Sequence, residues 1–362
     1  MKTAYFKKAD IKFCNVPIPP IDNHKIDSSV VFTSNQISKY SQSQTHPSIV
    51  YNASGWNGHK WWLATTPYPY ATGVFENPCI YYADDQNDEK PPIDFTPISG
   101  TASGDYTMVS NPIVKVTTNE AVNSDPDIIL IDNTMYLISR NNIVRHTPYM
   151  QKSLTGQAWT VRDSDPLWDD VNMGLPELIS PSFVKIGNKI RAYCCTGTTG
   201  TTNVDIPNAS GVSWGTYIME GTTFENGGDF QYVGKCYISG DKKVQPWHMD
   251  VCEHNGVYYM VVCAKEIGSG TNAMHLFLAK STDGITFHMF SKPLFNAYNQ
   301  YRPTICVDAS NNIVIYGAIT NANPSAEERG IATEAPDGRY IFMVTDSITN
   351  IIGALEDNEW SN

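Results

Sequence analysis

Apolar residues in this chain gather in short runs of strand length, and no run shows the 3.6-residue period of an amphipathic helix. The runs "VYYMVVCA" (257–264) and "NIVIYGA" (312–318) are alternating or continuously apolar, which is typical of strands in a sheet core. Turn pairs such as Asn57-Gly58 and Asn255-Gly256, which favour positive φ, join apolar runs and indicate β-hairpins. The pattern therefore predicts an all-β protein.

One pattern of polar start, apolar strand, turn and aromatic strand occurs five times along the chain. The copies begin at His46, Ser124, Ile179, Trp247 and Tyr301. Starts separated by about fifty to eighty residues suit a four-stranded unit with variable loops. We therefore expect a five-bladed β-propeller of four-stranded antiparallel blades. A β-sandwich array is the alternative fold.

The two ends of the chain match no copy of the repeat. We assign residues 1–40 to an N-terminal extension, 41–346 to the propeller and 347–362 to a C-terminal tail, whose acidic end "ALEDNEWSN" (354–362) is expected to be exposed. The extension either supplies the strand that closes the ring or attaches the domain to a larger particle.

Composition and charge exclude several classes of partner. The net charge of -12, without any basic stripe, argues against nucleic acid, which is bound through clustered Lys and Arg. No apolar run reaches the roughly 18 residues of a membrane span, so no membrane partner is expected. The N-terminus lacks the apolar segment of a signal peptide.

Eight cysteines fall mostly inside apolar strand-like runs such as "AYCCTG" and "YMVVCAK". No CxxC pair or Cys/His cluster indicates a zinc site. We interpret them as buried free thiols in a protein that folds in a reducing cytoplasm, and we expect no metal and no cofactor.

In a propeller the first strand of every blade lines a central channel, so the polar residues that begin the repeats are expected to surround one pocket. The candidate residues at this pocket are His46, Asp125, Asp127, Glu177, His248, Asp250 and Arg302. Asp250 and Arg302 either form an ion pair or leave the Arg302 guanidinium free for a phosphate or a sugar carboxylate.

The aromatic stretch "SGWNGHKWWLATTPYP" (54–69) separates into core and surface positions. Trp61 and Trp62 are adjacent and must face opposite sides of a strand, so both are assigned to blade packing. Trp56 lies at the hairpin and is expected to be the exposed ring. Tyr68, Glu76 and Asn77 flank the next connection and are expected at the pocket rim, where rings stack on sugars and polar groups bind hydroxyls.

The ordered set "HPS", "SDPD", "SPSFVKIGNK", "WHMDV" and "RPTI" resembles the five-bladed propellers of family 43-like glycoside hydrolases from about residue 44 to 345. In that family a base, an orienting Asp and an acid Glu come from the first three blades. The resemblance implies that Asp125 is the orienting residue. His46 stands at the base position and Ile179 at the acid position, with Glu177 two residues earlier on the same strand face.

A second resemblance is carried by "GWNGHKWWLATTPYP" followed by "ENPCIYYADD" and "SDPDI", which is similar to the propeller domain of bacteriophage tail-fibre and receptor-binding proteins. It implies a virion protein made in the host cytoplasm. Its implied partners are a host cell-surface glycan and other tail proteins, and its implied assembly is a homotrimer.

Because His46 and Ile179 replace two of the three family carboxylates, we expect a tail-associated, carbohydrate-binding receptor protein and not an enzyme. The alternative is a family 43-like glycoside hydrolase that cleaves a polysaccharide with Asp125 and Glu177. The second alternative is a structural virion component with an inert propeller.

Overall fold

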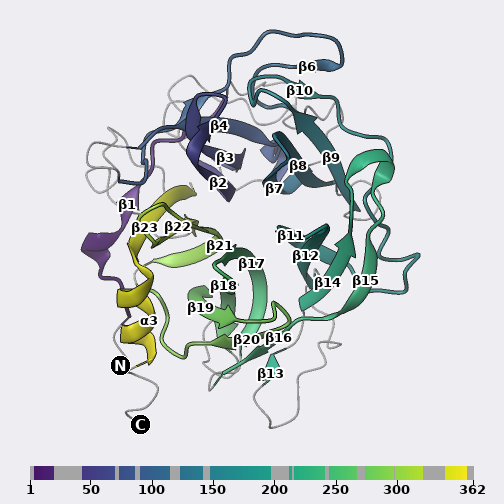
Figure 1. The fold of residues 1–362 in the computed structure, drawn as a ribbon. Coiled ribbons are helices and arrows are strands. Elements are labelled where there is room, and N and C mark those ends of the chain that lie inside the picture. The colour runs from purple at the N-terminus through teal and green to yellow at the C-terminus, as the bar shows by residue number, and fades with distance from the viewer. Residues whose placement is uncertain are drawn as a thin grey trace, which may run out of the picture.

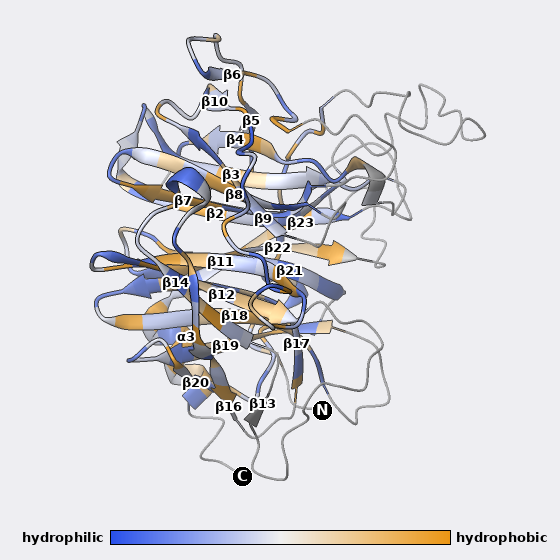
Figure 2. Cartoon of the chain, turned by 90° about the vertical axis from the view of Figure 1, so that its right-hand side faces the viewer, coloured by the Kyte–Doolittle hydropathy of each residue, from blue (hydrophilic) through white to orange (hydrophobic). Residues whose placement is uncertain are grey.

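Five antiparallel sheets are arranged around a central axis as the blades of a β-propeller in the computed structural model (Figure 1). The structure describes residues 4–19, 43–69, 73–85, 90–114, 123–141, 147–196, 212–213, 216–240, 244–266, 274–296, 298–320 and 339–356. The predicted fold class is confirmed. Hydrophobic segments concentrate on the strands of the stacked blades (Figure 2).

Each blade begins with an inner strand beside the axis and continues outward. Blade 1 is formed by β2 (Gln44–Trp56), β3 (His59–Pro67), β4 (Cys79–Ala83) and β5 (Thr96–Pro97). Blade 2 is formed by β7 (Asn123–Ile131), β8 (Thr134–Asn141) and β9 (Thr147–Ser153), beside the short pair β6 (Tyr106–Met108) and β10 (Trp159–Thr160). Blade 3 is formed by β11 (Leu178–Ile186), β12 (Lys189–Thr196), β14 (Thr216–Gly221) and β15 (Gln231–Lys235).

The last two blades carry the additions to the basic unit. Blade 4 is formed by β17 (Val244–His254), β18 (Val257–Glu266), β19 (Met274–Ser281) and β20 (Thr286–Met289), extended by β16 (Tyr237–Ser239) and β13 (Val212–Ser213). Blade 5 is formed by β21 (Asn299–Val307), β22 (Asn312–Thr320), β23 (Tyr340–Ser347) and β1 (Lys12–Phe13). The helical elements are η1 (Lys8–Asp10), η4 (Gly73–Phe75), η6 (Glu225–Gly227) and α3 (Ile348–Glu356). In the part of the chain that the structure describes, no helix has the length and apolarity needed to cross a bilayer.

The outermost strand of blade 5 comes from the N-terminal segment. Strand β1 pairs antiparallel with β23 through Lys12 and Met343, and the Cys14 N–H donates to the Ile341 carbonyl. Both ends of the chain therefore contribute to one sheet, which ties the ring together (Figure 1). Helix α3 follows β23, and its Ile351 and Leu355 are buried. Both side chains complete the core of blades 4 and 5, so the expectation that 354–362 is exposed is wrong for Leu355.

The tryptophans of β3 pack between blades. Trp61 belongs to a core cluster with Tyr316 of blade 5, and Trp62 belongs to another with Trp159. Both side chains are buried on opposite faces of the strand, as predicted.

The expectation that Trp56 is an exposed ring is wrong, because its side chain is only 3% exposed. Its indole packs edge-on against Trp62 and donates from Nε1 to the Asn133 carbonyl at 3.3 Å. The adjacent Asn57 amide donates to the Leu154 carbonyl, so the hairpin tip lies against blade 2. Trp56 is thus at the end of β2 that is distant from His46.

The eight cysteines are all free, and seven are buried while Cys252 is partly buried. The prediction of buried, unpaired thiols is confirmed. Burial raises the pKa of every one of these thiols, for example that of Cys236 to about 12, so they are held as neutral, apolar core groups.

All five inner strands have a break in register near the start, where a β-bulge lets one extra residue project. At three of these bulges the residue before proline has a φ of 53°, in the left-handed region: His46, Asp125 and Ser180. A non-glycine residue in this region is strained, and such strain is often found at functional sites.

Shortly after each bulge, a buried polar side chain faces the axis. We call this set the polar ring: Ser48, Asp127, Ser182, Asp250 and Thr304. The Ser48 hydroxyl donates to Asp127 at 2.6 Å, and the Ser182 hydroxyl donates to Asp250 at 2.6 Å. The Thr304 hydroxyl donates to the other Asp250 oxygen at 2.7 Å.

Backbone N–H groups complete the polar ring. Asp127 accepts from the Phe183 N–H at 2.8 Å, and Thr304 accepts from the Ile49 N–H at 3.0 Å. Blade 1 is therefore bonded to blade 2, blade 2 to blade 3, and so on until blade 5 returns to blade 1. Burial, and next the charge of Asp250, raises the pKa of Asp127 to about 7.

We predict that Ser182→Ala lowers the free energy of unfolding by about 1–3 kcal/mol, because it leaves an Asp250 oxygen and the Val251 N–H without a partner. Urea denaturation of the variant measures the change. Ser54→Ala, at an exposed hairpin position, is the control and should change the value by less than about 0.5 kcal/mol. Equal effects of the two substitutions would contradict the structural role of the polar ring.

Candidate functional site

One residue from the bulged start of each inner strand meets the others at the axis; on β17 this is His248, which follows the bulged Trp247. We call this set the strand-start cluster: His46, Asp125, Ser180, His248 and Arg302. Each is at most 3% exposed. The sequence-based prediction named four of them. Ser180 was missed, although it stands before the proline of the third copy exactly as His46 and Asp125 do in theirs.

Asp125 is the centre of the strand-start cluster. Its oxygens lie 2.8 Å from Arg302 Nη1, 2.9 Å from Arg140 Nε and 3.5 Å from His46 Nε2. Burial alone would raise the pKa of Asp125, but the charges of Arg140 and Arg302 hold it well below its usual range. The carboxylate is therefore permanently ionised. The suggested ion pair of Arg302 with Asp250 is not formed, because Asp250 bonds within the polar ring.

The two histidines of the cluster are neutral. Burial lowers the pKa of His46 to about 3 and that of His248 well below its usual range. His46 Nδ1 lies 3.0 Å from Thr66 Oγ1. His248 Nδ1 lies 2.5 Å from Ser180 Oγ, whereas His248 Nε2 has no hydrogen-bond partner among the described residues. A buried imidazole nitrogen without a partner is costly unless a ligand uses it.

Glu76 adds a carboxyl group whose pKa is shifted in the opposite direction from that of Asp125. It lies in the connection before β4 and is 8% exposed. Burial, and next the charge of Asp125, raises the pKa of Glu76 to about 8. Its backbone is fixed on both sides, because its N–H donates to the Gly73 carbonyl and its carbonyl accepts from the Asn123 N–H. Glu76 is thus a proton-bearing acid at neutral pH.

The rim of the site holds partly exposed side chains. Glu177 lies 3.7 Å from Arg140 Nη1, and burial raises its pKa. Tyr301 contacts both histidine rings, with its centroid 4.5 Å from that of His248. Arg140 was not predicted, although the hairpin register that pairs it with Ser124 is readable from the spacing of β7 and β8.

Four predicted ligand residues do not reach the site. Asp127 and Asp250 belong to the polar ring, and Trp56 is buried at the other end of blade 1. Asn77 is buried, and its amide oxygen accepts from Asn123 in a hydrogen bond between blades 1 and 2. Their roles in this structure are in packing and blade connection.

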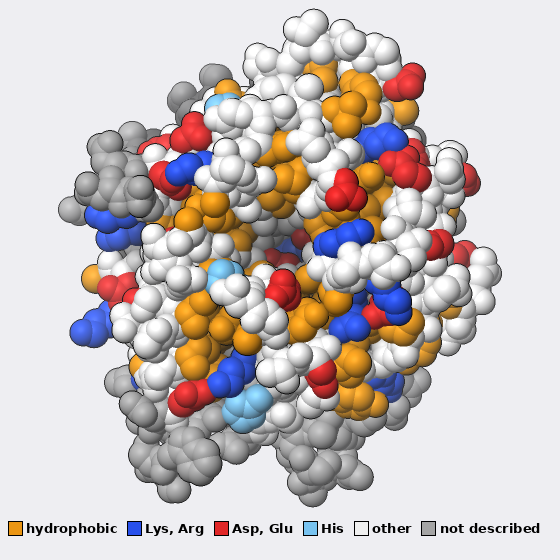
Figure 3. Space-filling model, viewed as in Figure 1, with side chains coloured by type: hydrophobic (Ala, Val, Ile, Leu, Met, Phe, Trp, Pro, Cys, Tyr) orange, Lys and Arg blue, Asp and Glu red, His pale blue; other side chains and the backbone are white. Residues whose placement is uncertain are grey.

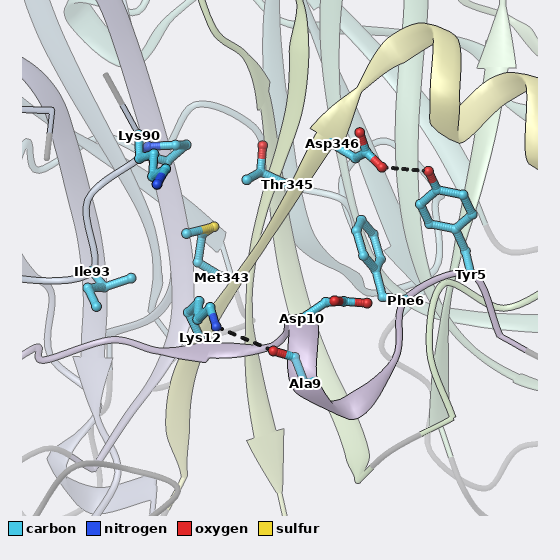
Figure 4. Close-up of a pocket in the computed structure, with 11 residues that line it drawn as sticks. Tyr5, Phe6, Ala9, Asp10, Lys12, Lys90, Ile93, Met343, Thr345 and Asp346 are labelled. Carbon is cyan, nitrogen blue, oxygen red and sulfur yellow. Dashed lines mark hydrogen bonds between the residues drawn. The ribbon is translucent and has the colours of Figure 1, made fainter. Parts of the chain in front are cut away.

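Two of the cavities among the described residues lie outside the strand-start cluster. One, of about 360 Å³, lies between the later halves of the inner strands and includes Asp127 and Asp250 in its wall. A hollow at the ring centre is visible in the space-filling view (Figure 3). The other, of about 720 Å³, lies beside β1, where the Tyr5 hydroxyl donates to Asp346 at 2.7 Å (Figure 4). None of the predicted ligand residues lines this second cavity.

Metal coordination is not indicated by the described ranges, which contain no group of three His, Cys, Asp or Glu side chains placed to hold an ion. At the strand-start cluster the reason is visible, since guanidinium groups occupy both Asp125 oxygens.

Comparison with known proteins gives structural neighbours only. No protein-family model matches the chain, and no curated protein matches it. The chain is similar to an N-acetylgalactosamine deacetylase from F. plautii, solved with blood group B trisaccharide, at a TM-score of 0.66 and 15% identity over 95% of this chain and 96% of that one. It is also similar to a GH43_1 enzyme from Xanthomonas citri, solved with xylotriose, at a TM-score of 0.55 and 11% identity over 84% and 87% of the chains.

A third neighbour is a family 43 β-xylosidase/α-arabinofuranosidase from a compost metagenome, at a TM-score of 0.53 and 13% identity over 84% and 92% of the chains. At these identities the likeness shows the fold. These neighbours are carbohydrate-active enzymes, and this finding overturns our expectation of a bacteriophage receptor-binding protein.

We predict that the Glu76 carboxyl titrates near pH 8 in the folded protein. The protein labelled with ¹³C at the Glu side chains should show one carboxyl resonance with this midpoint, and Glu76→Gln should lack it. Because the folded state binds this proton more tightly than the unfolded state, wild type should lose stability relative to Glu76→Gln as pH rises from about 4.5 to about 8. A midpoint near 4.5 would contradict the burial of this group.

Proposed function

We propose that this protein is a carbohydrate-active hydrolase that removes an acyl group from an N-acylated sugar. The observation that carries the proposal is the neutral His248, which is fixed at Nδ1 by Ser180 and whose Nε2 has no partner among the described residues, in the same cluster as the ionised Asp125. A neutral imidazole with one open nitrogen is suited to general base catalysis.

Asp125 itself is a poor general base. Its two oxygens are engaged by Arg302 and Arg140, and its pKa is held well below the usual range. Glycoside hydrolysis requires a carboxylate that is free to activate water or attack the anomeric carbon. Asp125 is instead assigned to positioning, since it orients His46 and the two guanidinium groups.

Each remaining group has one role in the proposed reaction. With Nδ1–H donating to Ser180 Oγ, His248 Nε2 takes a proton from the water that attacks the acyl carbonyl carbon. The protonated Glu76 gives its proton to the leaving amine nitrogen as the C–N bond breaks, so carboxylic acid and amino sugar are released. A proton passed from His248 to Glu76 restores the starting state. The overall resemblance to an N-acetylgalactosamine deacetylase across 95% of the chain supports this choice of reaction.

We predict that His248→Asn and Glu76→Gln each lower acetate release from N-acetylhexosamine oligosaccharides by about 10²–10⁴-fold. Wild-type activity should fall above about pH 8, where Glu76 loses its proton. Lys185→Gln, at an exposed position near the other end of β11, is the matched control and should retain activity. Full acetate release by both site variants would exclude the proposed roles.

A second candidate function is glycosidic bond hydrolysis, favoured by one observation. The site combines a carboxylate of depressed pKa, Asp125, with two carboxyls of raised pKa, Glu76 and Glu177. Environments that separate the pKa values of carboxyls are typical of acid and base pairs. Release of reducing sugar that disappears in Asp125→Asn and Glu177→Gln, without acetate release, would select this reaction.

A further inference from the structure

We propose that Arg339 binds the carboxylate of an acidic sugar next to the reacting residue, which makes uronate-containing glycans the preferred substrates. This inference rests on the proposed function and names the substrate class of the same site. It starts from the contacts of Arg339 with two tyrosine rings at the rim.

The Arg339 guanidinium lies over two aromatic rings. Its Cζ lies 3.7 Å from the centroid of Tyr68 and 4.3 Å from that of Tyr301. The backbone is fixed as well, because Ser43 Oγ accepts from the Arg339 N–H and donates to the Tyr68 carbonyl. Stacking of this kind occupies the faces of the guanidinium and leaves its edge for hydrogen bonds.

That edge has unused donors. The guanidinium makes one hydrogen bond, from Nη1 to Thr45 Oγ1 at 3.4 Å, and no carboxylate of the described residues pairs with it. Arg140 and Arg302 are different, since both are paired with Asp125. An arginine has five N–H donors in a planar fork that matches a carboxylate. Arg339 is thus pre-oriented for an anion that the described residues do not supply.

The position of Arg339 places this anion beside the reaction centre. Tyr301, one of its two aromatic partners, lies against the His248 and His46 rings at centroid distances of 4.5 and 5.7 Å. The Arg339 charge also acts on Glu76, where it lowers the pKa and so partly offsets the effect of burial. A ligand bound at Arg339 and a group held at His248 are therefore separated by a single tyrosine ring.

The local charge supports an anionic ligand, although the whole chain carries a net charge of -12. Arg140 and Arg302 are paired with Asp125, and Arg140 also lies near Glu177, while Glu76 keeps its proton at neutral pH. The positive charge of Arg339 is left without a carboxylate partner among the described residues. Its location on a partly exposed guanidinium would attract an acidic glycan to the rim.

The experiment compares binding of two probes. One is a disaccharide of N-acetylglucosamine and glucuronate, and the other is the same disaccharide with its carboxyl reduced to an alcohol. By calorimetry wild type should bind the acidic probe about tenfold or more tightly than the neutral one. In Arg339→Gln this ratio should fall to about one, and in Arg339→Lys it should be intermediate, because the charge remains without the fork.

Controls separate this inference from a folding defect and from the proposed function. Lys185→Gln removes the same charge elsewhere and should keep the ratio, and thermal melting should show Arg339→Gln folded. A ratio near one in wild type, or an unchanged ratio in folded Arg339→Gln, would overturn the inference. Acetate release from both probes at equal rates would overturn it while retaining the proposed function. A binding preference for the acidic probe without any acetate release would support the inference and exclude the proposed function.

A third probe is N-acetylglucosamine 6-sulfate, which should bind more weakly than the uronate. Stronger binding of this probe would overturn the choice of a carboxylate and identify a sulfate as the preferred anion.

Discussion

The circle of hydrogen bonds in the polar ring is the constraint on which the rest of the structure depends. A propeller has no single core, and its inner strands meet only at the axis. Ser48 bonds to Asp127, Ser182 and Thr304 bond to Asp250, and backbone N–H groups of blades 3 and 1 close the circle. Because these bonds are buried, each missing partner costs the desolvation of the group left behind. The ring thereby fixes the positions of the bulges that begin the inner strands.

The chemistry of the site follows from that fixed frame. The bulges hold His46, Asp125 and Ser180 in a strained left-handed conformation, so that five side chains from five blades converge. Burial makes both histidines neutral, and the surrounding arginines keep Asp125 charged. The same low-dielectric environment keeps the proton on Glu76. One site thus contains an ionised carboxylate, a neutral base and a protonated acid.

The departures from a two-carboxylate arrangement change the reaction that this frame supports. His46 and Ser180 occupy bulge positions on blades 1 and 3, while the acids Glu76 and Glu177 approach from connections outside the inner strands. Arg339 approaches from the start of β23 and contacts Tyr68 and Tyr301, with no acidic partner among the described residues. The reaction centre and the proposed carboxylate site are therefore built from different blades, and substrate preference and chemistry are separable by substitution.

The sequence by itself determined the architecture and part of the site. Five copies of one strand-turn-strand pattern specify five blades, because alternation and turn residues are local properties. The same repeats placed His46, Asp125, His248 and Arg302 together. Only the tertiary structure decided which polar side chains hold the blades together and which are available to a ligand. Asp127 and Asp250 form hydrogen bonds within the polar ring, and Trp56 is buried against blade 2. Partners such as Arg140 and Arg339, and the pKa values that they set, depend on distances between strands that are far apart in the chain, and a linear pattern does not encode those distances.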